Sequence, residues 1–420
     1  MTRKQQVEPY DVLIAGGGLV GASLGGALAQ AGLRCCVLEA VPFAAADQPS
    51  FDERTIALTW GSRLIFAGLG VWPQIIATDA EPIRSIHISR RGGFGICRLD
   101  CTGMGVDALG YVVPTRVLGR VLLDRLQQAL GVDYYCPARV EAVQPAVDRV
   151  TVQVKTEQGS LQLRGDLLVV AEGGRSSLRE QLGYKVYARP YEAEVLLTTV
   201  STGQSHNGRA FERFTEHGPL ALLPMRENRY AVVWTLPAAR VDHLRACDDA
   251  QFLAQIQADF GYRAGIFTAP GIRLRYPLAR SRVEPLAQQR SVLLGNAAHL
   301  LHPVAGQGFN LGLRDVAHLA EVLATAHQHG EDLGSDRVLQ KYTALRRDDI
   351  RRVQGFTHGL MTAFTQQWPG LSLARQIGLL LVDSLPLVQR RLLQHTMGLA
   401  GPRSQLSLGL PLARPTGENE

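Results

Sequence analysis

The six cysteines of this 420-residue chain form no metal-binding or redox pattern. Cys35 and Cys36 are adjacent, and no two cysteines stand in a C-x-x-C arrangement. A zinc site or a redox-active dithiol usually needs such spacing, so the sequence argues against both. Free thiols in a reducing compartment are the simpler interpretation, and we expect a cytoplasmic protein without a metal site.

The charges also lack a pattern, because no long run carries one sign. The formal net charge of +6 comes from scattered arginines, which are mixed with acidic residues as in 346–349. Scattered charge is typical of a solvated surface, so we expect no nucleic-acid partner. A length of 420 residues and 46% hydrophobic composition allow a large core, in two closely packed domains or one large one.

One segment, residues 12–33, carries no charge and is long enough to cross a membrane. The glycines clustered in it favour a nucleotide-binding turn over a transmembrane helix. Residues 1–6 before it are polar, and we therefore expect no signal peptide.

The glycine cluster has the spacing of a dinucleotide-binding turn. Residues 10–15 predict a buried parallel strand, and Gly16, Gly18 and Gly21 follow in a G-x-G-x-x-G pattern that includes Leu19 and Val20. These glycines would allow the tight turn, the approach of a pyrophosphate and close helix packing. Glu39 ends the next strand, where a carboxylate binds a ribose 2′-hydroxyl and repels a 2′-phosphate. The pattern predicts FAD or NAD rather than NADP.

Later segments return to the same domain. The apolar strand 166–171 ends in Glu172 and Gly173, and the strand 291–294 ends in Gly295 and Asn296, before a glycine-rich loop and a helix over 311–326. We expect an α/β fold with three parts. A discontinuous Rossmann-like domain takes residues 1–80, 110–186 and 285–350, an antiparallel-sheet domain for the substrate takes 81–109 and 187–284, and a helical segment takes 351–420.

Two arginines are candidates for anion contacts. Arg54 is expected at the start of a helix that runs towards Gly68. A cation at this positive end of the helix dipole is unfavourable unless it binds an anion. A cofactor contact and a surface ion pair both explain it. Arg116 is expected in the first turn of a helix that Pro114 opens.

The three strand ends together carry a resemblance. The G-x-G-x-x-G turn, Glu172-Gly173 and Gly295-Asn296 stand in the order found in flavoprotein aromatic hydroxylases of the para-hydroxybenzoate hydroxylase fold. Within that family, segments 51–58, 209–224 and 296–315 resemble the ubiquinone-biosynthesis hydroxylases. The resemblance covers nearly the whole chain.

The resemblance implies an FAD site built from known motifs. It implies that the glycine-rich segment lies at the flavin, and that a loop over the isoalloxazine ring contains His302 and Pro303. The flavin segment comprises Gly306, Gln307, Gly308, Phe309 and Asn310. Two positions depart from the wider family, which has aspartate where Asn296 and Glu172 stand; the Asn296 departure matches the ubiquinone subgroup.

The resemblance also implies the reaction. The substrate would be a polyprenyl-methoxyphenol such as 2-octaprenyl-6-methoxyphenol, hydroxylated para to its hydroxyl with molecular oxygen and NAD(P)H through a flavin 4a-hydroperoxide. We name no protein general base. Candidate pocket walls are Phe211, Leu222, Pro224 and Trp234, although ordinary core packing is the simpler explanation for them. A sister ring-hydroxylation step, a flavin-dependent reductase or dehydrogenase, and a non-catalytic assembly subunit stay open.

Two further expectations concern partners. No other G-x-G-x-x-G unit follows Gly21, so NAD(P)H is expected to reduce the flavin without a second dinucleotide domain. Apolar residues of the segment 371–399 fall at helical spacing beside Arg375, Arg390 and Arg391. This pattern predicts a contact with the inner-membrane surface or with other ubiquinone-biosynthesis proteins. Packing of that helix on the protein's own body is the alternative.

Overall fold

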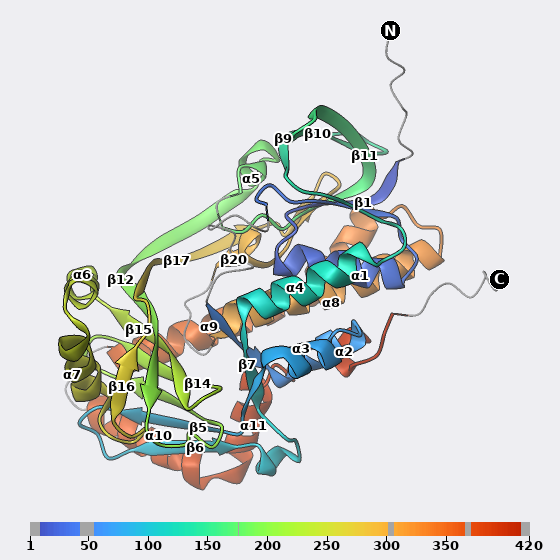
Figure 1. Ribbon diagram of the computed structural model, residues 1–420. Coiled ribbons are helices and arrows are strands. Elements are labelled where there is room, and N and C mark those ends of the chain that lie inside the picture. Colours follow the sequence, from blue (N-terminus) through green and yellow to red (C-terminus); the bar gives the residue numbers. More distant parts are fainter. Residues whose placement is uncertain (1–8, 43–53, 175, 301–305, 366–370, 413–420) are drawn as a thin grey trace.

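The computed structural model describes residues 9–42, 54–174, 176–300, 306–365 and 371–412. Two large sheets lie at opposite ends of the molecule and a small sheet stands between them (Figure 1). Two cavities of the molecule are each lined by residues from more than one of these sheets.

The first sheet has a parallel centre. Its strand order is β18-β19-β11-β1-β2-β8, parallel from β19 to β8, and β9 and β10 extend β11 as an antiparallel meander. The central strands β1, β2 and β19 are mostly apolar and almost fully buried, as is expected of strands that are covered on both faces of the sheet. The strand bounds are β1 Tyr10–Ala15, β2 Cys35–Leu38, β8 Val132–Tyr135, β9 Ala138–Pro145, β10 Val150–Thr156, β11 Gly159–Val170, β18 Ala287–Gln288 and β19 Ser291–Leu293.

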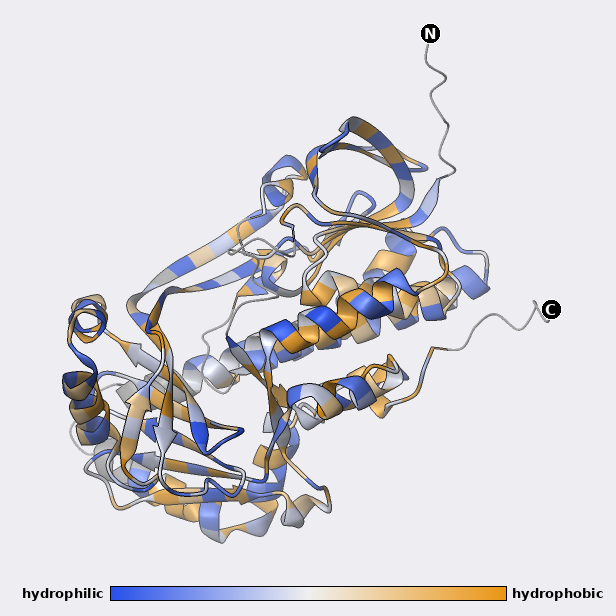
Figure 2. Ribbon diagram, viewed as in Figure 1, coloured by the Kyte–Doolittle hydropathy of each residue, from blue (hydrophilic) through white to orange (hydrophobic). Residues whose placement is uncertain are grey.

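Three helices share a buried core with this sheet: α1 (Leu19–Gln30), α4 (Thr115–Gln127) and α8 (Gln307–Gln328). Helix α1 packs against both α4 and α8, as Figure 1 shows. Hydrophobic and hydrophilic residues alternate along α4 (Figure 2), and its Leu118, Val121, Leu122 and Leu126 are buried. Helix α4 begins directly after Pro114, as the sequence predicts, whereas α8 begins four residues before the predicted start at Leu311.

The second sheet is antiparallel except where β13 and β5 run parallel. Its order is β20-β17-β12-β15-β14-β13-β5-β6, with β16 paired to β12. Helices α6 (Ala238–Ala246) and α7 (Asp249–Phe260) share a buried core with one face of this sheet. The strand bounds are β5 Ser85–Arg90, β6 Ile96–Asp100, β12 Lys185–Thr202, β13 Arg209–Phe214, β14 Pro219–Met225, β15 Arg229–Leu236, β16 Phe267–Pro270, β17 Leu274–Glu284 and β20 His299–Leu300.

The small sheet joins the two large ones. It consists of β3 (Thr55–Thr59), β7 (Gly110–Pro114) and β4 (Glu81–Ile83), all antiparallel. Helix α2 begins only at Trp60, so the prediction of a helix starting near Arg54 is wrong. The segment 55–59 is extended because it pairs with β7 along its whole length. Short helices complete the chain here and elsewhere: α2 Trp60–Gly68, α3 Trp72–Asp79, η1 Thr102–Met104, α5 Leu178–Gln181 and η2 Gly295–Ala297.

The C-terminal segment is helical, as expected. It contains α9 (Asp336–Thr365), α10 (Leu371–Ser384), α11 (Pro386–Thr396) and η4 (Leu406–Leu408). Helix α10 packs on β6 of the second sheet. Within the part of the chain that is described, no helix combines the length and the hydropathy needed to cross a membrane.

Candidate cofactor and substrate site

A cavity of about 550 Å³ opens where the parallel strands of the first sheet end. This edge of an α/β sheet is the usual place for a nucleotide. Residues that immediately follow β1, β2, β11 and β19 line it. Twelve of the predicted cofactor residues are in this lining: Gly16, Gly18, Leu19, Val20, Glu39, Arg54, Glu172, Gly173, Gly295, Asn296, Gly308 and Phe309.

Only glycine at position 16 lets the turn after β1 lie this close to the end of β11. The φ of Gly16 is +105°, and a Cβ atom there would lie 2.7 Å from the backbone carbonyl of Ala171. Gly18 is the N-cap of α1, and no side chain caps that helix. The free amides of the first turn therefore face the cavity with the positive end of the helix dipole, and both features fit an anionic pyrophosphate.

Gly21 acts through packing and does not line the cavity. A Cβ atom at Gly21 would lie 1.8 Å from the carbonyl oxygen of Gly16, so only glycine lets α1 approach the turn. Glu39 is held beside the same turn, because its carboxylate accepts hydrogen bonds from the amides of Gly17 (2.7 Å) and Val41 (2.8 Å). A carboxylate fixed in this way fits a ribose hydroxyl.

The end of β11 places a second carboxyl at the cavity. Ser176 Oγ donates to Glu172 Oε2 at 2.8 Å, and burial raises the pKa of the Glu172 carboxyl. Arg139 from β9 lines the same cavity and lowers that pKa through its charge. Sequence reasoning missed Arg139; its position on the outer meander carries no motif that could have identified it.

A buried ionic network supports the Gly295–Asn296 turn. Asp315 of α8 accepts a hydrogen bond from the amide of Gly295 (3.2 Å) and also contacts His299 Nε2 (2.6 Å) and Arg346 Nε (2.8 Å). Burial acts to raise the pKa of Asp315, but His299 and Arg346 outweigh it and hold that pKa at about 2. The network fixes the turn, and Asn296 beside it lines the cavity.

The start of α8 provides the second helix terminus of the site. Gly306 is its N-cap in the left-handed conformation (φ +60°), without a side-chain cap. Gln307, Gly308 and Phe309 of the first turn line the cavities. Asn310 instead points into the protein, where it bonds the backbone of Ala57, Thr59 and Gly306. Its role is to tie α8 to β3.

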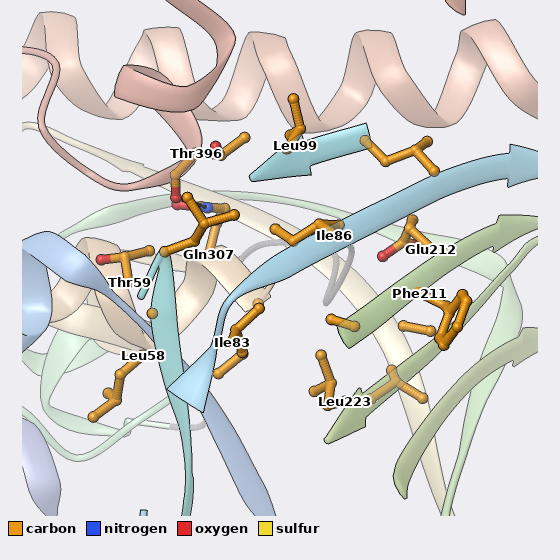
Figure 3. Close-up of a pocket in the computed structure, with 18 of the residues that line it drawn as sticks. Leu58, Thr59, Ile83, Ile86, Leu99, Phe211, Glu212, Leu223, Gln307 and Thr396 are labelled. Carbon is orange, nitrogen blue, oxygen red and sulfur yellow. Dashed lines mark hydrogen bonds between the residues drawn. The ribbon is translucent and has the colours of Figure 1, made fainter. Parts of the chain in front are cut away.

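A second cavity of about 740 Å³ adjoins the first. The two share Arg54, Thr55, Ile56, Asn296, Gly308 and Phe309, so a ligand part at this junction contacts both spaces. The second cavity is mostly apolar and extends between the second sheet and the helices α10 and α11 (Figure 3). The apolar side chains come from several elements: Ile83, Ile86, Ile88, Leu99, Leu197, Leu223, Val233, Leu379, Val382 and Leu392.

The predicted pocket walls occupy a different face of the second sheet. Leu222 and Trp234 are fully buried in the core that the sheet forms with α6 and α7. Phe211 belongs to the same core and touches the cavity as well, whereas Pro224 is absent from the cavity lining. Their strand neighbours line the cavity instead: Glu212, Ala221, Leu223 and Val233.

The two arginines differ in their positions. Arg54 lies at the junction of the cavities, and its guanidinium stands over the Tyr276 ring, 5.2 Å from the ring centre. Arg116 is outside both linings and forms an ion pair of 3.8 Å with Asp79. The positions therefore favour a cofactor contact for Arg54 and a surface contact for Arg116.

His299 is occupied by Asp315, and no group of metal-binding side chains occurs among the described residues. His302 and Pro303 lie outside the described residues.

Comparison with known proteins identifies the family to which this chain belongs. The family described as "FAD binding domain" matches residues 9–357. The ubiquinone hydroxylase UbiL of Rhodospirillum rubrum is 34% identical over 96% of this chain and 93% of its own length. The chain belongs to the FAD-dependent hydroxylases of the ubiquinone-biosynthesis family.

Other relatives agree. The 3-demethoxyubiquinol 3-hydroxylase of Escherichia coli is 31% identical over 93% of this chain and 99% of its own. The structure of p-nitrophenol 4-monooxygenase PnpA from Pseudomonas putida matches with a TM-score of 0.78 at 19% identity, covering 94% of this chain and 99% of that one. This hydroxylase is thus an FAD-dependent monooxygenase of the para-hydroxybenzoate hydroxylase fold, and NAD(P)H is the reductant typical of its family.

Proposed function

We propose that the protein hydroxylates a 2-polyprenyl-6-methoxyphenol at the ring carbon para to its hydroxyl. The product is the 1,4-benzoquinol precursor of ubiquinone. The observation that carries this proposal is the apolar cavity of about 740 Å³ that meets the cofactor cavity at Asn296 and Phe309. An apolar wall suits a prenylated ring, and the junction holds that ring against the flavin edge.

The cavity also limits how the substrate is held. Its volume is within the range of roughly 300–1,000 Å³ that is usual for ligand pockets. It suits an aromatic ring with its first isoprene units, so the rest of a long polyprenyl chain has to leave the protein. The side chains of β5, β6, α10 and α11 exclude water from the ring, which favours oxygen transfer over loss of the oxidant to solvent.

Different residues of the cavity fit different parts of the FAD molecule. Glu39 would hold the adenosine ribose, the turn at Gly16 the pyrophosphate, and Asn296 with the first turn of α8 the ribityl chain and the flavin edge. FAD supplies the activation of molecular oxygen by electrons from NAD(P)H. The positive end of α8 favours the negative charge that the reduced flavin carries. Overall, phenol, oxygen, NAD(P)H and a proton give quinol, water and NAD(P)⁺.

The position of the hydroxylated ring carbon is the most specific part of the proposal. An electron-rich phenol reacts ortho or para to its oxygen, and the choice of para is supported by the resemblance of segments 51–58, 209–224 and 296–315. The Escherichia coli relative is named for hydroxylation of 3-demethoxyubiquinol at position 3. A sister step is therefore the competing outcome of any test.

Mass analysis of the quinone precursors in a strain that lacks the protein tests the step. We expect accumulation of a polyprenyl-methoxyphenol without oxygen at the para carbon, and its disappearance when the gene is restored. A precursor already oxygenated at that carbon would move the protein to a sister step. Phenol-dependent oxygen uptake by the purified protein tests the monooxygenase activity separately.

We further propose that α10 and α11 bring the cavity to the membrane surface. Their inner residues Leu379, Val382 and Leu392 line the cavity, while apolar side chains on their outer faces are exposed. Arg390 and Arg391 of α11 are exposed beside them and suit anionic headgroups. The exposed apolar residues are Ile377, Leu380, Leu381, Leu385, Leu387 and Val388.

A further inference from the structure

Glu212 is a carboxyl group inside an otherwise apolar part of the substrate cavity. It projects from β13 and lines the cavity together with Ile86, Leu99 and Leu223, and in Figure 3 it lies closest to Phe211 among the labelled residues. Its Oε1 atom is buried and has no hydrogen-bond partner among the described residues. Burial raises the pKa of this carboxyl to about 7. Buried polar groups in native proteins are nearly always paired, so this one needs a partner that the chain does not supply.

The neighbours of Glu212 on the sheet give it no cation. In the strand register it stands opposite Ala221 of β14 and Ile88 of β5. Arg213, the next residue, points to the other face, where it donates to Ser89 Oγ and to the carbonyl of Asp259. Asp259 in turn binds Arg91 and Arg240. The charges of this region are thus paired on the α7 side, and the carboxyl is left alone on the cavity side.

An unpaired carboxyl at this place costs stability, which is a feature expected of a binding group. The other charged side chain in the cavity lining is Arg54, at the cofactor junction. In Figure 3, Glu212 lies towards one end of the drawn cavity and Gln307, from the start of α8, towards the other. A ligand that spans the cavity therefore meets the carboxyl at one end and the flavin side at the other.

We propose that Glu212 binds the phenolic hydroxyl of the substrate. This inference rests on the proposed function, since it needs a phenol in the cavity. The phenol O–H donates to the carboxylate, a bond that is stronger than one between neutral groups. Because the para carbon lies across the ring from the oxygen, this bond directs that carbon towards the α8 end. Partial transfer of the phenol proton to Glu212 also makes the ring more electron-rich at the para position.

Binding of two matched ligands to the FAD-loaded protein tests the role of Glu212. The ligands are 2-methoxy-6-prenylphenol and its methyl ether, which lacks the O–H donor, and the readout is the change in flavin absorbance. The variants are Glu212→Gln, which removes only the charge, and Glu212→Leu, which removes all hydrogen bonding. Glu216→Gln, in the exposed turn after the same strand, makes the same chemical change outside the cavity and is the control.

We expect the wild type and the control to bind the phenol at least about tenfold more tightly than the ether, as a charged hydrogen bond of this kind allows. Glu212→Gln should lose part of this preference, and Glu212→Leu should bind both ligands equally. A tenfold preference retained in Glu212→Leu would overturn the inference. If the wild type binds neither ligand, the proposed substrate class fails, and the inference fails with it.

Discussion

At the scale of single residues, Gly16 is where one added carbon is expected to remove the cofactor. In Gly16→Ala the new Cβ would lie 2.7 Å from the carbonyl of Ala171 in a backbone conformation that favours glycine. The turn has to shift, and the diphosphate loses its close approach. Gly26→Ala is the matched control, because a Cβ there meets nothing closer than 4.0 Å, at Arg125. We expect colourless protein from the first variant and yellow protein from the second; full FAD occupancy in Gly16→Ala would refute the role of this turn.

The buried carboxyl of Glu212 leads to a second prediction, which concerns the stability of the protein. Burial raises its pKa from 4.5 to about 7, so the folded state favours the protonated form. The associated stability is complete below about pH 4.5 and is lost as the pH rises through 7. Cys97 of the same cavity lining, whose pKa burial raises to about 11, stays protonated over this range.

Glu212→Gln mimics the protonated form and should remove this pH dependence. Without substrate, we expect the variant to be more stable than the wild type by up to roughly 3 kcal/mol at pH 8 and by much less at pH 5. Denaturant unfolding of both proteins at the two pH values measures this. Equal stability differences at pH 5 and pH 8 would show that the carboxyl is paired.

At the scale of elements, the network on α8 determines whether the Gly295–Asn296 turn keeps its shape. Asp315→Asn removes the charge that pairs with His299 and Arg346, and it leaves Arg346 buried beside Asp349 alone. We expect a loss of about 3–5 kcal/mol in unfolding free energy, as for other broken buried pairs, together with weaker FAD binding. Asp348→Asn, an exposed change on α9, is the control. Unchanged FAD affinity in Asp315→Asn would separate the network from the site.

The same network predicts how the stability of the protein changes at acid pH. The pKa of Asp315 is held at about 2, below its usual value of 3.8, so its contribution is present above about pH 4 and is lost as the pH falls towards 2. Asp315→Asn should therefore lose less stability than the wild type over that interval. Denaturant unfolding from pH 5 to pH 2.5 compares the two.

The elements also show what the sequence could and could not predict. The positions of the Gly16 turn and of Glu39 at the cavity were predictable because they follow from backbone geometry within one strand-turn-helix unit. Which face of the second sheet borders the cavity was not predictable. Both faces carry apolar side chains, because one packs against α6 and α7 and the other lines the cavity. Trp234 and Val233 are equally apolar in the sequence, and only the packing of distant helices decides which faces the substrate.

Local reading failed in a similar way at residues 55–59. This segment was expected to lead into a helix, yet it forms strand β3, because all five of its residues pair with β7. The consequence reaches the site: Arg54, Thr55 and Ile56 now stand at the junction of the cavities. The ionic network of Asp315 with Arg346 likewise joins residues that no short motif connects.

At the scale of the whole molecule, the cofactor cavity, the substrate cavity and the outer faces of α10 and α11 follow one another. The substrate cavity lies between the flavin junction and these helices, whose outer faces carry a group of exposed apolar side chains. A polyprenyl chain that leaves the cavity on this side would enter the lipid without crossing water. Under the proposed function, this arrangement would give a lipid-embedded phenol direct access to the cavity.

The contact of α10 and α11 with lipid is open to a direct test. The double variant Leu381→Asp/Leu387→Asp places two charges on the outer faces, where Leu381 and Leu387 are 52% and 80% exposed. Each leucine that enters the lipid interface contributes up to roughly 1.5–3 kcal/mol, so the variant should lose at least about tenfold in co-sedimentation with anionic liposomes. Ile266→Asp/Ile272→Asp alters two equally exposed residues beside β16 and should bind liposomes like the wild type. Turnover of a water-soluble short-chain phenol should be the same in all three proteins, because the outer faces do not line the cavity. If the wild type fails to bind liposomes but is retained by another enzyme of the pathway through the same leucines, these helices dock on a protein and the membrane proposal is wrong.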